Sequence, residues 1–353
     1  MVSKSGNAST TLRQPHHAVL SGIAAAAICF CPVPAAADAV SDFYANKTIT
    51  ISVGLSAGGG YDGYARLLAR HFSRSMPGRP NVVVQNVPGG AGLTLVNALY
   101  NVTPKDGLSF GVFDRLIPLD PLLDGAQSHF DPSKFSWIGS MSQESLACVS
   151  WHRAKAKSLE ELKTTEIIMA ATGSTSDASI YPKLLETFLG LKLKVVNGYQ
   201  GASDAILAME RGEVDGFCPW SWTSIETTRP TWLAEKKIIP FLQMGLRKDP
   251  KHPDVPLALD LAKSKQDAEA LELMMSPSLF ARPFTAPPDI PKERLAALRQ
   301  AFADTLRDSD LLADAAKSKF AIDHVSGEEI EDQLRKVYSI PRDVVERVKA
   351  AIK

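Results

Sequence analysis

Loops rich in glycine and serine follow three strand-like apolar runs of this chain, and each leads into a segment with helical periodicity. The loops comprise residues 56–62, 86–92 and 172–177. The first turn of a helix leaves backbone N–H groups unpaired and carries a partial positive charge. Because glycine and serine let an anion approach those N–H groups closely, three such loops at one cleft would bind a small anion.

Two charged residues stand where α/β proteins bind ligands. Asp62 lies in the first turn of its expected helix, either as a helix-start acid favoured by the dipole or as a ligand-binding group. Arg115 follows a strand end, where it would either clasp a carboxylate through two hydrogen bonds or pair with its neighbour Asp114. Aromatic side chains that would wall a pocket, or simply pack in the core, are Tyr61, Tyr199, Trp220 and Trp222.

The motif G-x-S-x-G at residues 54–58 matches the nucleophile elbow of α/β hydrolases, with Ser56 as the nucleophile and His252 or His324 as the base. That elbow needs an earlier strand whose loop completes the oxyanion hole, and the short segment before Ser56 leaves no room for one. The glycines after the motif indicate a loop that provides exposed backbone. We therefore expect no catalytic residue, with a secreted serine hydrolase as the alternative.

Sequence motifs for metal ions and nucleotide cofactors are missing. The sequence contains no H-E-x-x-H or C-x-x-C pattern, no Walker loop, and no G-x-G-x-x-G with an acidic partner. We therefore expect neither a metal ion nor a cofactor.

The N-terminal segment has the pattern of a secretory signal peptide. Lys4 and Arg13 precede an apolar run over residues 18–30, and alanines follow it up to Ala37. A run of this length is too short to span a bilayer well. We expect residues 1–37 to be cleaved near Ala37 and the remaining chain to be exported to the periplasm.

Composition limits the partners of the chain. Its 353 residues, 45% hydrophobic and 22% charged, suit a globular protein of about two domains. The 39 basic side chains balance the 39 acidic ones, so the charge favours neither nucleic acid nor an anionic membrane as a partner. Beyond the predicted signal peptide, Cys148 and Cys218 form either a disulfide or two buried thiols.

Strand-like and helix-like segments alternate, which is typical of an α/β fold with parallel sheets. Expected strands cover residues 49–55, 81–85, 109–113, 167–171, 192–196 and 214–218. Prolines over 276–291 indicate an extended crossover, and the pattern after it is helical. With the last helices packed on the first domain, we expect one lobe from 38–145 and 282–353, the other from 146–281, and a ligand cleft between them.

Five motifs in order along the chain resemble the solute receptors of tripartite tricarboxylate transporters, the TctC or Bug family. Residues 57–62, Ala-Gly-Gly-Gly-Tyr-Asp, resemble the family's A-G-G-x-x-D loop, and residues 86–92 its N-x-P-G-x-G loop. The remaining motifs are a P-D-G turn with an inserted lysine at 104–107, a Y-x-G…G-x-V-D block at 199–201 and 212–215, and an A-P-x-G-x-P crossover at 286–291.

The resemblance implies a periplasmic-binding-protein-like fold of type II, whose two lobes close around a small carboxylate. It implies a monomeric receptor, not an enzyme, that delivers a di- or tricarboxylate or an aromatic acid to the permease subunits of a tripartite tricarboxylate transporter. A receptor that feeds a two-component sensor is the alternative to transport.

The resemblance also implies which residues bind. In the family, loop N–H groups and ordered waters hold the carboxylate oxygens, and the first-loop aspartate helps to place water. The matching residues are Ser56, Gly58, Gly59, Asp62, Gly89, Gly90, Gly173, Ser174, Ser176, Tyr199 and Gly201, to which we add Arg115. Arg115 replaces a small hydroxyl residue of the family and favours a second carboxylate, whereas Trp220 and Trp222 would accept an aromatic acid.

Overall fold

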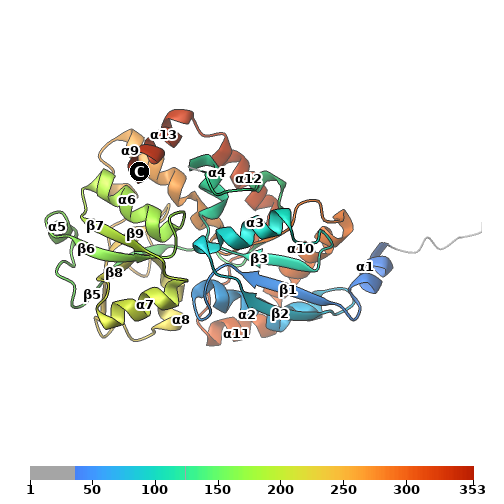
Figure 1. The fold of residues 1–353 in the computed structure, drawn as a ribbon. Helices are drawn as coiled ribbons and strands as arrows, with labels where there is room; N and C mark the ends of the chain where they lie inside the picture. Colours follow the sequence, from blue (N-terminus) through green and yellow to red (C-terminus); the bar gives the residue numbers. More distant parts are fainter. Residues whose placement is uncertain (1–35, 124) are drawn as a thin grey trace, which may run out of the picture. The chain divides into compact units, whose positions relative to one another are not determined.

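The computed structural model describes residues 36–123 and 125–353, and its strands there form two sheets (Figure 1). The first has the order β11-β4-β10-β3-β1-β2, and the second has the order β7-β6-β8-β5-β9. The first sheet consists of β1 (Thr48–Val53), β2 (Asn81–Asn86), β3 (Ser109–Val112), β4 (Ser136–Ser140), β10 (Pro283–Ala286) and β11 (Val325–Ser326). The second consists of β5 (Leu146–Trp151), β6 (Ile167–Ala171), β7 (Leu193–Asn197), β8 (Gly216–Ser221) and β9 (Ile238–Met244).

Helices connect these strands and cover the sheets. Those before β8 are α1 (Ala36–Tyr44), α2 (Gly60–Ser75), α3 (Leu93–Asn101), α4 (Asp120–Leu123), α5 (Leu159–Leu162), α6 (Asp177–Leu189) and α7 (Ala202–Arg211). Those after it are α8 (Trp222–Thr228), α9 (Lys265–Met275), α10 (Lys292–Arg307), α11 (Ser309–Lys317), α12 (Gly327–Tyr338) and α13 (Arg342–Ile352). Within the described residues, no helix has both the length and the apolar character needed to cross a bilayer. The predicted signal peptide lies outside these residues except at its last two positions.

The crossovers explain how the helices are distributed. The connection β1-α2-β2 leads from β1 to the edge strand β2. The connection β2-α3-β3 leads back past β1 to β3 on its other side. Because such connections are right-handed, the two helices cover opposite faces of the sheet, as Figure 1 shows for α2 and α3. The second sheet repeats this arrangement with α6 and α7 (Figure 1).

The sheets are mixed: they contain the expected parallel strands and, in addition, antiparallel ones. β1 runs parallel to β2 and β3, and β6 runs parallel to β7 and β8. By contrast, β10 runs antiparallel to β3 and β4, and β5 runs antiparallel to β8 and β9. The chain crosses between sheets at the edge where the parallel strands end. β5 and β10 therefore start at that edge and run in the opposite direction.

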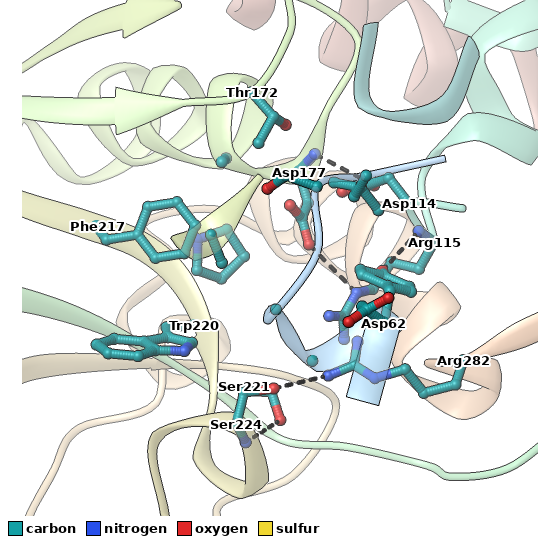
Figure 2. Close-up of a pocket in the computed structure, with 18 residues that line it drawn as sticks. Asp62, Asp114, Arg115, Thr172, Asp177, Phe217, Trp220, Ser221, Ser224 and Arg282 are labelled. Atoms are coloured by element: carbon teal, nitrogen blue, oxygen red, sulfur yellow. Dashed lines mark hydrogen bonds and ion pairs between the residues drawn. The ribbon is translucent and has the colours of Figure 1, made fainter. Parts of the chain in front are cut away.

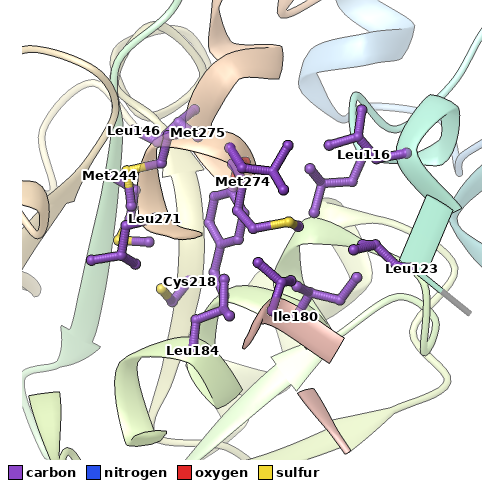
Figure 3. Packing of buried hydrophobic residues seen from close by; sticks show 14 of the residues in the cluster. Leu116, Leu123, Leu146, Ile180, Leu184, Cys218, Met244, Leu271, Met274 and Met275 are labelled. Carbon is purple, nitrogen blue, oxygen red and sulfur yellow. The ribbon is translucent and has the colours of Figure 1, made fainter. Parts of the chain in front are cut away.

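A single hydrophobic cluster includes side chains from both halves of the chain (Figure 3). It contains Leu116 and Leu123 from the segment after β3, Ile180 and Leu184 from α6, and Met274 from α9. Residues 36–353 form one compact unit. The lobe boundaries at 145 and 282 therefore stay a prediction.

The C-terminal helices divide between the two sheets. α10 and α11 pack against α2, and α12 packs against β4, as expected. α13 packs against α6 and α9 and also against α4. Lys183 and Thr187 of α6 donate hydrogen bonds to the carbonyls of Ile352 and Ala351. Because α13 contacts elements of both predicted lobes, the expectation that the last helices pack on the first domain stays a prediction. The extended crossover predicted from residue 276 is wrong at its start, where Ser276–Phe280 forms a 3₁₀ helix.

Cys148 and Cys218 form a disulfide between the neighbouring strands β5 and β8. Both side chains are fully buried in the cluster of Figure 3. The two alternatives left open by the sequence are therefore resolved in favour of the disulfide.

We predict that reduction destabilises the protein by about 2–4 kcal/mol, because the cross-link limits the conformations of the unfolded chain. Urea unfolding of the wild type with and without reductant measures this difference. The double variant Cys148→Ala/Cys218→Ala is the control, and reductant should not change its stability. An unchanged midpoint for the reduced wild type would contradict the prediction.

Candidate functional site

A small cavity lies where parallel strands of both sheets end. The loops after β1, β3 and β6 contribute Ser56, Arg115 and Thr172, and the end of β8 contributes Ser221. The cavity measures about 50 Å³, room for about four water molecules. Its lining residues are Leu55, Ser56, Gly59, Gly60, Tyr61, Asp62, Asp114, Arg115, Thr172, Asp177, Ala178, Ala202, Phe217, Pro219, Trp220, Ser221, Ser224 and Arg282.

The N-termini of three helices meet at this cavity. Gly60, Asp177 and Ala202 line it, and they are the first residues of α2, α6 and α7. The partial positive charge of each helix start therefore points toward the same small volume. This arrangement favours negative charge in the cavity.

Two buried arginines pair with two buried carboxylates beside the cavity. Arg115 Nε lies 3.2 Å from Asp177 Oδ2, and Arg115 Nη1 lies 3.7 Å from Glu144 Oε2. Arg282 Nη2 lies 2.8 Å from the same Glu144 oxygen and donates a hydrogen bond to Ser224 Oγ at 3.1 Å. All four charged side chains are buried, so each positive charge depends on a negative one for compensation.

Asp114 is a third buried carboxyl group, next to Asp177. Its Oδ1 accepts hydrogen bonds from the backbone N–H groups of Leu116 and Asp177, at 2.9 and 3.4 Å. Burial, and then the charge of Asp177, raise the pKa of Asp114 well above its ordinary value, and Arg115 offsets this only in part. A protonated Asp114 leaves the two arginines balanced by Asp177 and Glu144.

Tyr61 lies under both guanidinium groups. Its ring centroid is 4.4 Å from Arg282 Cζ and 5.9 Å from Arg115 Cζ, and its hydroxyl accepts a hydrogen bond from the Arg115 backbone N–H at 3.0 Å. Burial raises the pKa of Tyr61 although the arginines oppose this, so its hydroxyl stays protonated. Tyr61 thus positions the arginines without adding charge.

Asp62 lines the cavity, but its oxygens are occupied by the protein. Oδ2 accepts from the Gly58 N–H at 2.8 Å, Oδ1 accepts from Asn86 Nδ2 at 3.0 Å, and Arg66 Nε lies 3.0 Å from both. Burial acts to raise the pKa of Asp62, but these hydrogen bonds outweigh it and lower the pKa. The carboxylate therefore joins the first loop to the second.

The structure brings some of the predicted site residues to the cavity and places others behind it. Ser56, Gly59, Asp62 and Arg115 line it. The others are outside the lining: Gly58, Gly89, Gly90, Gly173, Ser174, Ser176, Tyr199 and Gly201. Ser176 accepts a hydrogen bond from the Ser179 N–H and caps α6. Whether these residues bind a ligand stays a prediction.

Two of these glycines allow the loops to touch. A Cβ atom on Gly173 would lie 3.0 Å from the Gly90 backbone, so the second and third loops meet there. A Cβ atom on Gly201 would collide with Ser56, whose N–H donates to the Gln200 carbonyl at 3.0 Å. The first loop and the turn at Gly201 therefore contact each other beside the cavity.

Sequence reasoning missed Glu144, Asp177, Phe217 and Arg282. Glu144 and Arg282 stand next to the two predicted crossovers, and Arg282 is the lone charge in an apolar run over 279–286. A charge inside such a run is a usable signal, because an arginine is rarely buried unless it is paired. Nothing local distinguished Asp177 from an ordinary acid in a first helical turn.

The hydrolase alternative lacks its base in the structure. Ser56 Oγ is buried and makes no hydrogen bond within the described residues. His252 stacks on Trp222 with 3.7 Å between ring centroids, and His324 lies beside Phe302. Neither histidine lines the cavity.

Comparison with solved structures identifies the fold. The periplasmic binding protein BugD matches with a TM-score of 0.69 and 18% identity over 87% of this chain and 98% of BugD. MatC from Rhodopseudomonas palustris with bound malate matches with a TM-score of 0.66 and 18% identity over 87% and 99% of the chains. This chain has the fold of the Bug- and TctC-type periplasmic binding proteins. The predicted periplasmic-binding-protein-like fold is thus confirmed.

A TctC solute-binding protein from Polaromonas extends the same comparison. It matches with a TM-score of 0.55 and 17% identity over 88% of this chain and 99% of its own. The UPF0065 protein in the TAR-I ttuE-ttuC' intergenic region of Agrobacterium vitis is 25% identical over 183 residues. That match covers 50% of this chain and only about half, 52%, of the curated relative. No family model matches the sequence.

We predict that Arg115 and Asp177 are energetically coupled. Arg115→Gln should cost about 3–5 kcal/mol because it leaves two buried carboxylates with one arginine, and Asp177→Asn should also destabilise. The double variant should lose less than the sum of the two, as urea unfolding measures. Arg211→Gln, which breaks an exposed pair with Glu213, is the control and should cost below about 1 kcal/mol. Strictly additive losses would contradict the coupling.

We predict that Asp114 gives the stability a negative slope with pH. The pKa of Asp114 in the folded state is raised above the ordinary aspartate value of about 4. Above about pH 4, the folded state therefore still holds a proton that the unfolded state has lost. Stability therefore falls as the pH rises from about 4 through the folded-state pKa. Asp114→Asn lacks this loss, so its free energy of unfolding relative to wild type should increase with pH. Parallel stability curves between pH 4 and 8 would refute the assignment.

Proposed function

We propose that this chain is a periplasmic solute receptor of the Bug and TctC type, which captures a small carboxylate and delivers it to the permease subunits of a tripartite tricarboxylate transporter. The observation that carries the proposal is the cavity where helix starts α2, α6 and α7 and the guanidinium groups of Arg115 and Arg282 converge. Loops of both sheets build this cavity, as a receptor that closes on its ligand requires.

The chemistry of the cavity favours an anion over its neutral analogue. Gly59 and Gly60 bring the backbone of the first loop to the cavity wall without side chains in the way. A carboxylate there would accept hydrogen bonds from backbone N–H groups at a helix start, in the field of the dipole. An uncharged amide would leave donors of this buried site poorly satisfied.

The comparisons support the class of ligand. MatC shares the fold, and its structure contains malate, which is a carboxylate. The predicted signal peptide supports export of the chain. The absence of a histidine from the described cavity lining, where Ser56 would need its base, favours binding over catalysis.

The contacts between loops suggest how binding would drive closure. The Ser56 N–H donates to the Gln200 carbonyl, and Ser203 Oγ donates to the Ala57 carbonyl at 3.1 Å. These contacts join the loop after β1 of the first sheet to the turn after β7 of the second and to the start of α7. A ligand that touches both loops stabilises this closed arrangement and shifts the population toward it.

We predict that a carboxylate stabilises the protein and that the corresponding amide does not. The chain from Asp38 onward is refolded to remove carried ligand and screened by thermal shift against mono-, di- and tricarboxylates and their amides. A ligand at 100 times its dissociation constant should add about 2.7 kcal/mol. Binding of the best acid should be retained in Arg211→Gln, an exposed arginine outside the cavity. A folded protein that responds to no carboxylate would overturn the proposed function.

A further inference from the structure

The buried acids at the cavity outnumber the buried cations. The carboxyl groups are those of Asp114, Asp177 and Glu144, and the guanidinium groups are those of Arg115 and Arg282. Asp62, which also lines the cavity, is balanced separately by Arg66. Among the residues that the structure describes, no lysine, histidine or further arginine lines the cavity. With all three carboxyl groups ionised, the site would therefore hold an excess of one negative charge before any ligand enters.

Asp114 is the acid on which a proton removes this excess with the least loss of pairing. Asp177 and Glu144 each form an ion pair with an arginine, whereas within the described residues no such pair involves Asp114. Asp114 lies in the loop after β3, and Asp177 begins α6 of the other sheet. Figure 2 shows the two side by side, joined by the hydrogen bond from the Asp177 N–H to Asp114 Oδ1. Both line the cavity, so a ligand would meet this pair directly.

The other ionisable groups around Asp114 keep a fixed charge. Burial raises the pKa of both Tyr61 and Tyr181, so both phenols stay protonated. Burial acts to lower the pKa of Arg115, but the acidic groups near it raise that pKa overall, so the guanidinium stays charged. The titratable and charged groups packed around Asp114 and its neighbour Arg115 are Tyr61 of α2, Asp177 and Tyr181 of α6, Glu144 between β4 and β5, and Arg282 before β10.

The two arginines retain donors for a ligand. Arg115 Nε and Nη1 and Arg282 Nε are buried and make no hydrogen bond within the described residues, although carboxylates lie near them. Buried donors normally find an acceptor, so these N–H groups indicate a ligand that brings acceptor oxygens. A carboxylate that accepts from them adds a further negative charge close to Asp114.

The protonation state of Asp114 therefore decides how much an anion gains by binding. An ionised Asp114 can only accept hydrogen bonds, and it repels the carboxylate of the ligand. A protonated Asp114 removes this repulsion and has an O–H group that can donate to a ligand oxygen. The effect is reciprocal, because an anion that binds more tightly to the protonated form also tightens the binding of the proton by the same factor.

We propose that the receptor binds its carboxylate ligand together with one proton, which Asp114 holds in the complex. This inference rests on the proposed receptor function and makes Asp114 a specificity-determining residue of the same cavity. The complex loses the proton at a higher pH than the ligand-free protein does, because the charge of the ligand favours the neutral acid. Between these two pH values the affinity should fall by about tenfold for each unit by which the pH rises, and below them it should be highest and constant.

Calorimetry of the ligand-free wild type measures the proton directly. The probes are acetate, oxalate and L-malate, which are ionised from about pH 6.5 upward, so that they do not exchange the proton themselves. Each acid is titrated at the same pH in two buffers of different ionisation enthalpy, and the difference in heat gives the number of protons taken up. We expect uptake of up to one proton between about pH 6.5 and about pH 9, with an affinity that falls as the pH rises.

The variant Asp114→Asn tests which group holds the proton. Asparagine keeps the oxygen that accepts from the N–H groups of Leu116 and Asp177, but it is neutral at every pH and has an N–H donor. The variant should take up no proton, and at the upper end of the pH range it should bind at least about tenfold more tightly than the wild type. A variant that was merely damaged would not gain affinity.

The matched control is Asp267→Asn. Asp267 is also buried, but it pairs with Arg347 of α13 and lies outside the cavity lining. The hydrogen bonds and charge of its surroundings keep its pKa low, although burial opposes this, so it does not take up a proton in this range. This variant should keep the pH dependence and the proton uptake of the wild type.

The outcomes separate this inference from the proposed function. A wild type that binds one of the acids with the same affinity at every pH and takes up no proton would overturn the inference and leave the receptor function intact. Uptake that persists in Asp114→Asn would also overturn it, because the proton would then be held elsewhere. If the folded protein binds no carboxylate at any pH, the proposed function itself fails.

Discussion

Four charged side chains are buried beside one small cavity, and the rest of the site depends on their neutralising one another. Arg115 pairs with Asp177 and Glu144, and Arg282 pairs with Glu144. Burial of an unpaired charge would cost several kcal/mol, so the four must be brought together by every element that carries them. These elements are the loop after β3, the start of α6 and the two crossings between the sheets. The same pairing that holds the cavity together sets its electrostatic character.

The topology explains why these elements meet. Parallel strands end at a common edge, and the chain leaves and re-enters each sheet at that edge, so β5 and β10 both start beside the loops of β1, β3, β6 and β8. Glycine allows the loops to approach, most closely where Gly201 contacts Ser56 and Gly173 contacts Gly90. Some of the glycines that resemble the family's binding loops therefore lie at contacts between loops, behind the cavity surface.

The sequence predicted the loops and the strands β1, β2, β3, β6, β7 and β8, because these features are local, but it missed β4, β5, β9, β10 and β11. An apolar run, a glycine that ends a helix and a small-residue loop are all visible within about ten residues. The strands β5 and β10 were not predicted, and their reversed direction depends on which end of a sheet the chain enters. The partners of Arg115 were missed for a similar reason. Asp177 and Glu144 become its neighbours only through the tertiary fold, whereas Asp114, the adjacent residue, was the partner that the sequence suggested.

The last helix has a consequence for how the protein would move. α12 packs against β4 of the first sheet, whereas α13 packs against α6 and α9 and also against α4, so the segment Ser339–Pro341 is a third connection between the predicted lobes, besides the two crossings near residues 145 and 282. Two adjacent connections leave one body free to twist as well as bend relative to the other. A third one, separate from them in the chain, removes much of the twisting freedom and leaves a single bending path. In the proposed receptor, opening and closing would then follow that path, and the outer rims of the closed form would meet in the same register whichever acid is inside. The membrane partner of such a receptor, if it docks on those rims, would recognise closure itself and not the chemistry of the ligand.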